Sequence, residues 1–466
     1  MLDLTGRTGP LHERLASALR SAIRTGQLPS GITLPPSRTL ANDLGCSRWV
    51  VTEAYGRLVS EGFLQARTGS GTRVQGDVGT IDPAGTAEPG TPVPRPTSYR
   101  YDMLPGVADL RAFPRQRWAE AVRAATTTMV YDDLWYADDN GLPLLRRRLA
   151  EYLIRCRGAL VTPKDVIVTS GTTNGLAQAF RTLRHAGFTS VAVENPSWQR
   201  PWWAAREVGL RVVPIPVDDG GLQVEKIIGR KELRAVLVTP AHQFPTGVSL
   251  APERRRQLLE WLHHVDGVLL EDDYDAEFRY DRLPVPTVQG MDPARVFLFG
   301  SVSKTLAPAV GLGWMALPPR WRALVRVANP AASGPSPLTQ AAFAHFVTSG
   351  GFDRHLRDSR RRLRTRRDAL VAALRQRLPE FPVTGIAAGL HLVLELGTAH
   401  AGRVPALLAR LGRAGVRLSD LDTFRSEPAP HRPGLVLGYG NLTDSVIDEA
   451  VAQLATTIDG DARNHR

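Results

Sequence analysis

Long apolar runs are missing from this chain, because no segment approaches the roughly 18 consecutive apolar residues that a membrane-spanning helix needs. The first ten residues, MLDLTGRTGP, also lack the basic stretch and the apolar core of a secretion signal. We therefore expect a cytoplasmic protein that has no membrane partner.

Cysteine and lysine are also scarce. The two cysteines, Cys46 and Cys156, exclude a disulfide framework and a cysteine-rich metal site, so no metal is expected. The formal net charge is nonetheless +12 and the isoelectric point about 10.2, which is compatible with a polyanionic partner such as DNA. Arginine carries nearly all of this charge, because the chain has only four lysines: Lys164, Lys226, Lys231 and Lys304.

The length of 466 residues predicts more than one domain, since single hydrophobic cores stop growing well below this size. We predict a helical DNA-binding domain over residues 1–75 and a flexible linker over residues 76–100, which are rich in Gly, Pro and Thr. Residues 101–466 form the third part, with a smaller α+β subdomain from about residue 350.

The N-terminal part carries the signals of three short helices and a hairpin. LHERLASALRSAIRTG places leucine or isoleucine at every fourth position of one helix face and ends at Gly26. SRTLANDLG predicts a second helix that ends at Gly45, and a third helix follows Ser47, a good N-cap, and closes at Gly62. FLQARTGSGTRV alternates around a Gly-Ser-Gly turn, as a two-stranded wing would.

A helix-turn-helix places the start of its recognition helix against base edges, while flanking donors bind phosphates. Residues 1–75 hold nine arginines against five acids, so this part is basic. A small helical domain for protein contacts is the alternative. The predicted DNA contacts lie at the starts of the second and third helices and in the small residues of the wing: Arg38, Ser47, Arg48, Trp49, Thr52, Thr68, Gly69, Ser70 and Gly71.

Beyond the linker, apolar runs alternate with helical stretches. The runs VIVTS, SVAVE, AVLVTP, VLLEDD and VFLFG read as strands. This alternation predicts an α/β domain with a mostly parallel sheet.

One lysine stands in a small-residue loop after a predicted strand, in GSVSKTLAP. Lys304 could form a Schiff base with an aldehyde if its surroundings lower the pKa of its amine. VTSGTTNGLAQAF offers a helix start for a phosphate, and VLLEDDYDAEFRY offers Asp272 and Tyr274 for a pyridine nitrogen and a ring hydroxyl. In VENPSWQRPWW, Trp198 follows a strand and a Pro turn and is suited to cover a flat ring.

These segments resemble known families. LPPSRTLANDLGCSRWVVTEAYGRLVSEGFLQARTGSGTRV resembles the DNA-binding domain of GntR-type regulators, and residues 100–460 resemble a fold type I aminotransferase. The whole chain is similar to the MocR-type regulators, which include GabR-like and PdxR-like branches.

The resemblance implies that pyridoxal 5'-phosphate (PLP) is the cofactor. By this similarity Lys304 is the Schiff-base lysine, Asp272 the partner of the pyridine nitrogen and Tyr274 the partner of the ring hydroxyl. It also implies that Trp198 stacks on the cofactor ring and that Tyr136 reaches the phosphate held by the other subunit. The remaining phosphate contacts that it implies are Ser170, Gly171, Thr172 and Ser301. HQFPTG, from His242, stands where aminotransferases carry HNPTG.

Two positions depart from the pattern. Gly311, in SKTLAPAVGLGW, replaces an arginine that helps to hold the phosphate, and Val436, in LVLGYG, replaces the arginine that binds a substrate carboxylate. Arg200 matches a second arginine position of GabR-like sites and is the predicted effector-binding residue. Because transamination commonly needs a bidentate arginine on the carboxylate, Val436 favours a sensor over an enzyme.

We therefore expect a homodimeric regulator without catalytic residues that binds a double-stranded DNA operator. Its effector is PLP or an amine or amino acid, and its targets are genes of vitamin B6 or amino-acid metabolism. Two alternatives stay open, an active PLP-dependent aminotransferase with a fused DNA-binding domain and a regulator whose large domain serves only for dimerisation. The arginine-rich helix over residues 354–367 is interpreted as a solvated face, with a second DNA contact as the alternative.

Overall fold

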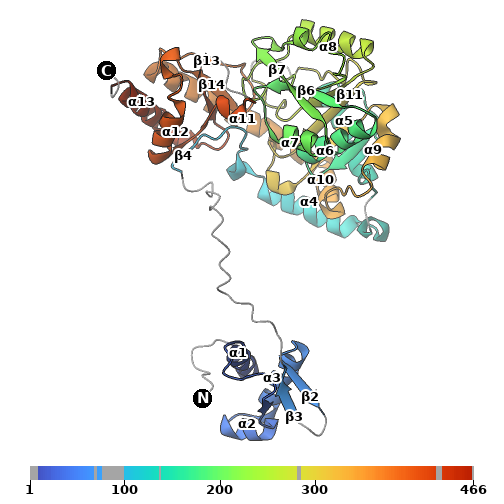
Figure 1. Cartoon of the computed structure of the whole chain (residues 1–466), viewed down its shortest axis with the longest axis vertical. Helices are drawn as coiled ribbons and strands as arrows, with labels where there is room; N and C mark the ends of the chain where they lie inside the picture. Colours follow the sequence, from blue (N-terminus) through green and yellow to red (C-terminus); the bar gives the residue numbers. More distant parts are fainter. Residues whose placement is uncertain are drawn as a thin grey trace. The chain divides into compact units, whose positions relative to one another are not determined.

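The computed structural model describes residues 9–67, 71–75, 99–135, 138–280, 285–426 and 433–463. The chain divides into two compact units, Met1–Arg95 and Pro96–Arg466 (Figure 1). The linker predicted over residues 76–100 lies outside the described residues as far as residue 98.

The N-terminal unit consists of three helices and a three-stranded antiparallel sheet in the order β1-β3-β2. The predicted helices and the two wing strands are confirmed, whereas β1 was not predicted. Gly26, Gly45 and Gly62 follow the helices with φ of 75°, 63° and 80°, the left-handed conformation that ends a helix. The elements are α1 (Leu11–Arg24), β1 (Thr33–Leu34), α2 (Ser37–Asp43), α3 (Arg48–Ser60), β2 (Leu64–Arg67) and β3 (Gly71–Val74).

The apolar stripe of α1 packs on α3. Leu15, Leu19, Val51 and Leu58 are almost fully buried in one core cluster, whereas Arg48 and Trp49, the first two residues of α3, are exposed. The predicted cap of α3 is wrong in one detail, because the side chain of Ser47 makes no capping hydrogen bond.

An eight-stranded sheet forms the centre of the C-terminal unit, in the order β5-β12-β11-β10-β9-β6-β7-β8. The pairs between β11, β10, β9, β6 and β7 are parallel, which confirms the predicted mostly parallel α/β sheet. Strand β12 runs antiparallel to both of its neighbours, and it was not predicted, nor were β7 and β8. The strands are β5 (Val166–Thr169), β6 (Ser190–Asn195), β7 (Arg211–Asp218), β8 (Gly221–Leu222), β9 (Ala235–Val238), β10 (Val268–Asp272), β11 (Val296–Ser301) and β12 (Gly313–Ala316).

Helices cover both faces of this sheet (Figure 1). Because side chains alternate along a strand, Phe297 and Phe299 of β11 pack into one core cluster, whereas Leu298 packs into another on the opposite face. The helices are α4 (Arg115–Thr128), α5 (Pro143–Arg157), α6 (Thr172–His185), α7 (Arg200–Glu207), α8 (Pro252–His264), α9 (Arg322–Ala328) and α10 (Pro337–Thr348).

The C-terminal part forms a smaller α+β layer with its own core cluster. Its sheet has the order β13-β14-β17-β16 and is antiparallel. The start of the unit joins this layer, because β4 (Tyr101–Asp102) pairs in parallel with β15 (Val416–Arg417). The other elements are α11 (Gly351–Arg377), β13 (Val383–Thr384), β14 (His391–Glu395), α12 (Val404–Arg413), β16 (Ser419–Asp420), β17 (Gly434–Gly438) and α13 (Ile447–Arg463).

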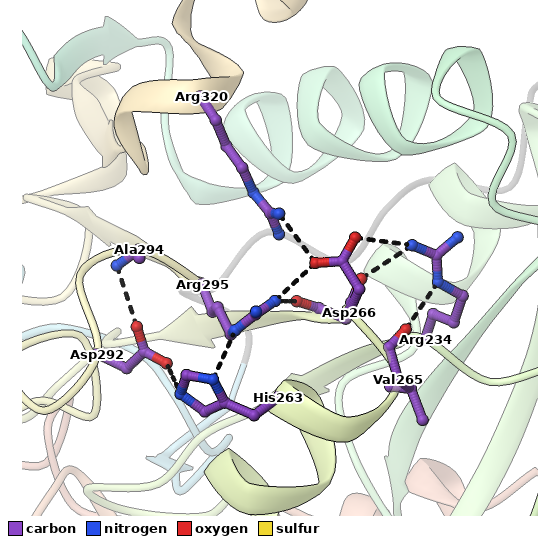
Figure 2. Close-up of polar contacts among 9 residues, drawn as sticks. Arg234, His263, Val265, Asp266, Asp292, Ala294, Arg295 and Arg320 are labelled. Atoms are coloured by element: carbon purple, nitrogen blue, oxygen red, sulfur yellow. Dashed lines mark hydrogen bonds and ion pairs between the residues drawn. The ribbon is translucent and has the colours of Figure 1, made fainter.

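One exposed carboxylate forms ion pairs at the edge of the large sheet where β9, β10 and β11 begin (Figure 2). Asp266, in the turn before β10, has a φ of 46° and pairs with Arg295 at 2.8 Å and Arg320 at 3.0 Å. A third guanidinium, of Arg234, lies 3.4 Å away. The carboxyl ends of the parallel strands lie at the opposite edge, and this is where open α/β sheets bind their ligands. Within the described ranges, no helix combines the length and the apolar character that a membrane span requires.

Candidate cofactor and DNA-binding sites

The strand register gathers most of the predicted cofactor residues at one edge of the sheet. Gly313, the first residue of β12, pairs with Thr169 at the end of β5 and with Ser301 at the end of β11. Asp272 ends β10, the next strand along. Segments from residues 169 to 313 therefore meet at a single edge.

Lys304 lies in the loop after β11 and points at the start of the unit. Its Nζ donates a hydrogen bond of 2.5 Å to the carbonyl of Gly106. Burial lowers the pKa of its amine below the usual value, and the carboxylates of Asp275 and Asp272 only partly oppose this effect. A lowered pKa leaves more of the amine in the neutral form that attacks an aldehyde.

Asp272 faces the same space with an unused acceptor. Its Oδ1 is buried and has no hydrogen-bond partner among the residues that the structure describes. Burial raises the pKa of its carboxyl to about 7, with a smaller contribution from Asp273 and an opposing one from Lys304. A carboxyl in this state is ready for a cationic partner, and a protonated pyridine nitrogen fits that requirement.

Tyr274 belongs to a buried polar group that the sequence analysis did not assign. Its hydroxyl lies 3.1 Å from Nδ1 of His242, and the same nitrogen lies 2.9 Å from Oδ2 of Asp275. Burial, followed by the charges of Asp275 and Asp272, raises the pKa of Tyr274 well above its usual value. The motif HQFPTG and the Asp next to Tyr274 were the available signals for this group.

His391 completes this group from β14 of the smaller layer. Its ring centroid lies 5.0 Å from that of His242, and its Nε2 bonds to the carbonyl of Pro245 at 3.1 Å. Donor atoms of His242, Asp275 and His391 all lie within 4.8 Å of one another, a grouping that could also hold a metal ion. Because His242 and His391 already bond to Asp275 and Pro245, we interpret the group as a support for Tyr274.

The predicted phosphate loop surrounds the start of α6. Gly171 has a φ of 117°, and a Cβ there would meet no atom within 4 Å, so open space lies in front of this backbone. The hydroxyl of Thr172 is buried, with no hydrogen-bond partner within the described part of the chain, and Ser170 is exposed beside it. Ser301 is buried at the end of β11 and accepts a hydrogen bond from the amide of Ser303 at 3.3 Å. Free amides and hydroxyls at a helix start are suited to a phosphate.

Trp198 stands after β6 with 47% of its surface exposed. It contacts Phe244 edge-on at 6.0 Å and Phe424 at 6.4 Å, which holds its indole ring in place. The guanidinium of Arg200 lies 6.0 Å from the indole centroid and is exposed. A fixed but open aromatic ring can cover a flat cofactor.

The two departures from the family pattern have different structural contexts. Gly311 lies in the left-handed region with a φ of 60°, where a side chain is strained, so the backbone here suits glycine. Val436 is fully buried in a cluster of hydrophobic side chains. The other members of this cluster are Phe244, Val393, Leu421 and Phe424.

Tyr136 lies outside the described residues, so its predicted phosphate contact has no structural counterpart here. The residues before it expose unusual apolar surface: Tyr131 is 93%, Leu134 59% and Trp135 73% exposed. Exposed aromatic side chains of this size are typical of a protein interface.

The predicted DNA-binding residues that the structure describes lie on the surface of the N-terminal unit. Arg38, Ser47, Arg48 and Thr52 are exposed, and Trp49 is 62% exposed. The Nε of Arg48 lies 3.4 Å from Oγ of Ser37, which brings the starts of α3 and α2 together.

In the wing, Gly71 is exposed with a φ of 81°. The other predicted wing contacts, Thr68, Gly69 and Ser70, lie outside the described residues.

Two family models match the two units. Residues 11–74 match bacterial regulatory proteins of the gntR family, and residues 109–453 match aminotransferase class I and II. Along 96% of its length the chain is also 32% identical to 93% of the probable rhizopine catabolism regulatory protein MocR of Rhizobium meliloti. The chain belongs to the MocR-type regulators.

Two further relatives of this MocR-type regulator are also named as transcriptional regulators. It is 30% identical to the pyridoxine biosynthesis regulator PdxR of Corynebacterium glutamicum, over 96% of this chain and 95% of that one. It is 29% identical to the regulator TauR of Rhodobacter capsulatus, over 97% of both chains. The role in transcription is therefore shared, whereas the regulated pathway differs among relatives.

Solved structures confirm the fold of the large unit. An archaeal alanine:glyoxylate aminotransferase superposes with a TM-score of 0.69 at 23% identity, over 77% of this chain and 91% of that one. LysN, the α-aminoadipate aminotransferase of Thermus thermophilus, gives 0.68 at 24% identity, over 78% and 93%. This MocR-type regulator thus combines a GntR helix-turn-helix with a fold type I aminotransferase-like domain.

Proposed function

We propose that the regulator binds PLP at Lys304 and that this binding controls its occupancy of an operator. The observation that carries the proposal is the meeting of Lys304, Asp272 and the start of α6 at one edge of the sheet. Bound PLP would supply an aldehyde for the amine of Lys304. The buried acceptor of Asp272 and the free hydroxyl of Thr172 give its ring nitrogen and its phosphate fitting partners.

The remaining residues would orient the ring. Tyr274, held by His242 and Asp275, is suited to bond the ring hydroxyl, and Trp198 is suited to cover the ring face. Ser170, Gly171 and Ser301 would add amide and hydroxyl groups to the phosphate.

The large unit acts as a sensor without physiological turnover. Val436 sits where a bidentate arginine would fix a substrate carboxylate, and its side chain is fully buried in a hydrophobic cluster. Arg200 remains near the site, but a single exposed arginine does not form a two-armed clamp. The effector that fits is PLP itself or an amine whose binding needs no such clamp.

The regulated genes are those of vitamin B6 or amino-acid metabolism. The relative PdxR, named for pyridoxine biosynthesis, supports vitamin B6 as the first choice. Two copies of the chain would bind two half-sites of a double-stranded operator, and the exposed surface around Trp135 supports a homodimer.

Footprinting on the DNA upstream of the chain's own gene tests the proposal. Occupancy is expected to change when PLP is added to the wild type and to stay constant for Lys304→Ala. Occupancy that ignores PLP in the folded wild type would overturn the sensor role, and full regulation by Lys304→Ala would leave the large unit a dimerisation domain only.

The second candidate function is an active aminotransferase, which the fold of the large unit favours. It requires steady turnover of an amino donor with a keto acid, and Lys304→Ala would abolish that turnover.

A further inference from the structure

The amine of Lys304 donates a hydrogen bond to the backbone at the start of the C-terminal unit. Its 2.5 Å hydrogen bond ends on the carbonyl of Gly106, nearly two hundred residues away in sequence. The lysine amine also lies close to the Cα side of Gly106, since a Cβ on this residue would lie 3.3 Å from Nζ. No side chain of residue 106 intervenes between this backbone and the lysine.

Residues 100–107, here called the arm, form backbone hydrogen bonds with the smaller layer. The amide of Met103 donates to the carbonyl of Arg417 at 2.7 Å, and the amide of Gly438 donates to the carbonyl of Met103 at 2.8 Å. Glycine allows the close approach, because a Cβ on Gly438 would lie 2.2 Å from the carbonyl oxygen of Leu104. The arm therefore has little room to move while these bonds and the Lys304 bond are intact.

In sequence, the arm lies one residue beyond residues 76–98, through which the chain passes from the DNA-binding unit to the large unit. Any shift of the arm therefore acts on the point at which this connection enters the large unit. The cofactor lysine and this entry point are joined by one hydrogen bond and a few residues of chain.

We propose that Lys304 is a latch, whose amine holds the arm through Gly106 when PLP is absent and releases it when PLP is bound. The inference rests on the proposed function and adds its route of regulation. The trigger is a balanced condensation. Nζ forms a bond to the aldehyde carbon of PLP, and the aldehyde oxygen leaves as water with the two hydrogens of the neutral amine.

Once it is bonded to carbon, the lysine nitrogen keeps neither of the two hydrogens that the amine could donate. The carbonyl of Gly106 then loses its donor. A half-buried carbonyl without a partner is unfavourable, so the arm shifts until water or another donor reaches it.

Two substitutions of Lys304 separate its hydrogen bond to Gly106 from its covalent bond to PLP. Lys304→Met keeps a chain of similar length but has no donor, so it should release the arm without PLP. Lys304→Arg keeps N–H donors for Gly106 but forms no bond to PLP, so it should hold the arm whether or not PLP is added. Lys226→Met, at an exposed lysine, is the control for a lost lysine charge.

Hydrogen exchange of the full chain, followed by mass spectrometry, reads the arm directly through the amides of Tyr101, Met103 and Gly438. We expect PLP to speed exchange in the wild type about threefold to tenfold, as the loss of one hydrogen bond implies. Lys304→Met without PLP should match the wild type with PLP, and Lys304→Arg should match the wild type without it. Circular dichroism and thermal melting check that the variants are folded.

The outcomes separate the latch from the proposed function. If borohydride reduction attaches PLP to Lys304 and arm exchange does not change, the latch is wrong and the cofactor site stands. Equal exchange in Lys304→Met and wild type, both without PLP, also overturns the latch. If no adduct forms on Lys304, the proposed function fails, and the trigger of the latch fails with it.

Discussion

Charge and burial conflict at single residues of the cofactor edge, and Asp272 is the clearest case. Its carboxyl is buried, the charge of Asp273 adds to the effect of burial, the charge of Lys304 opposes it, and its pKa rises to about 7. Such an arrangement destabilises the cofactor-free protein in return for a ready partner for a cation, as binding sites commonly do.

Asp272→Asn is therefore expected to stabilise the protein without PLP at alkaline pH. The pKa of Asp272 is higher in the folded protein than in the unfolded chain, so the folded state favours the protonated carboxyl. The stability that this protonation gives the wild type is fully present below about pH 4 and is lost as the pH rises through about 7. At pH 8 the variant should gain about 1–3 kcal/mol in free energy of unfolding, and at pH 4 little or nothing. Urea unfolding at both pH values measures this, with PLP titrations expected to show weaker binding. An equal effect at pH 4 and pH 8 would contradict the assignment.

Val436 gives a second prediction at this scale. Because its surroundings are packed and apolar, Val436→Arg does not restore a carboxylate clamp; it buries an unpaired charge and should cost more than about 3 kcal/mol. The matched variant Val436→Ala only leaves a cavity and should cost about 1–3 kcal/mol. Urea unfolding and assays with amino donors check both. A Val436→Arg protein that folds normally and transaminates would contradict the sensor interpretation.

At the residue scale, the sequence identified side chains that belong to recognisable motifs. Lys304, Asp272 and Thr172 were predicted, and strand register brings their segments together. The bond from Lys304 to Gly106 was not predictable, because it depends on how two distant segments pack and involves a backbone carbonyl that has no sequence signal.

Among the elements, α3 carries the direct contact with DNA in this account. Arg48→Ala should weaken binding to an operator fragment by about 1–3 kcal/mol, as expected for one lost base or phosphate contact. Arg57→Ala is the matched control, because Arg57 lies at the other end of α3 and pairs with Glu61 and Glu13. Fluorescence anisotropy at fixed salt compares the two. Equal losses would show that only net charge matters.

The turn before β10 offers a test of a structural element away from the site (Figure 2). Hydrogen bonds from Arg295 and Arg320 lower the pKa of Asp266 to about 2, so its contribution is present above about pH 4 and lost as the pH falls through about 2. Asp266→Asn keeps a residue that tolerates positive φ and should cost less than about 1 kcal/mol at pH 7, because the pairs are exposed. Thermal melts at pH 7 and pH 2 should differ from wild type only at pH 7; a deficit that persists at pH 2 would assign the effect to the backbone.

Element prediction succeeded for continuous buried apolar runs. It failed for strands that are short, and for β7, RVVPIPVD, whose apolar run is interrupted by two prolines. The buried runs of β5, β6, β9, β10 and β11 were recognised, but β1 and β8 have only two residues each. Strand β12, GWMA, follows the loop that carries Lys304 and has too few residues for a period. Such strands exist because their neighbours pair with them, and a single segment does not carry that information.

Across the whole molecule, the basic balance and the family both point to DNA, whereas the cofactor depends on one amine. The net charge of +12 is carried almost entirely by arginine, which does not form imines with aldehydes under these conditions. Of the four lysines, Lys164, Lys226 and Lys231 are exposed, and Lys304 is the one beside Asp272.

Peptide mapping after borohydride reduction of the folded, full-length protein with PLP tests the central claim most directly. The account predicts a stable pyridoxyl adduct on Lys304, with the three exposed lysines serving as internal controls for random labelling. A protein that remains folded and carries the adduct elsewhere, or carries none, would contradict it.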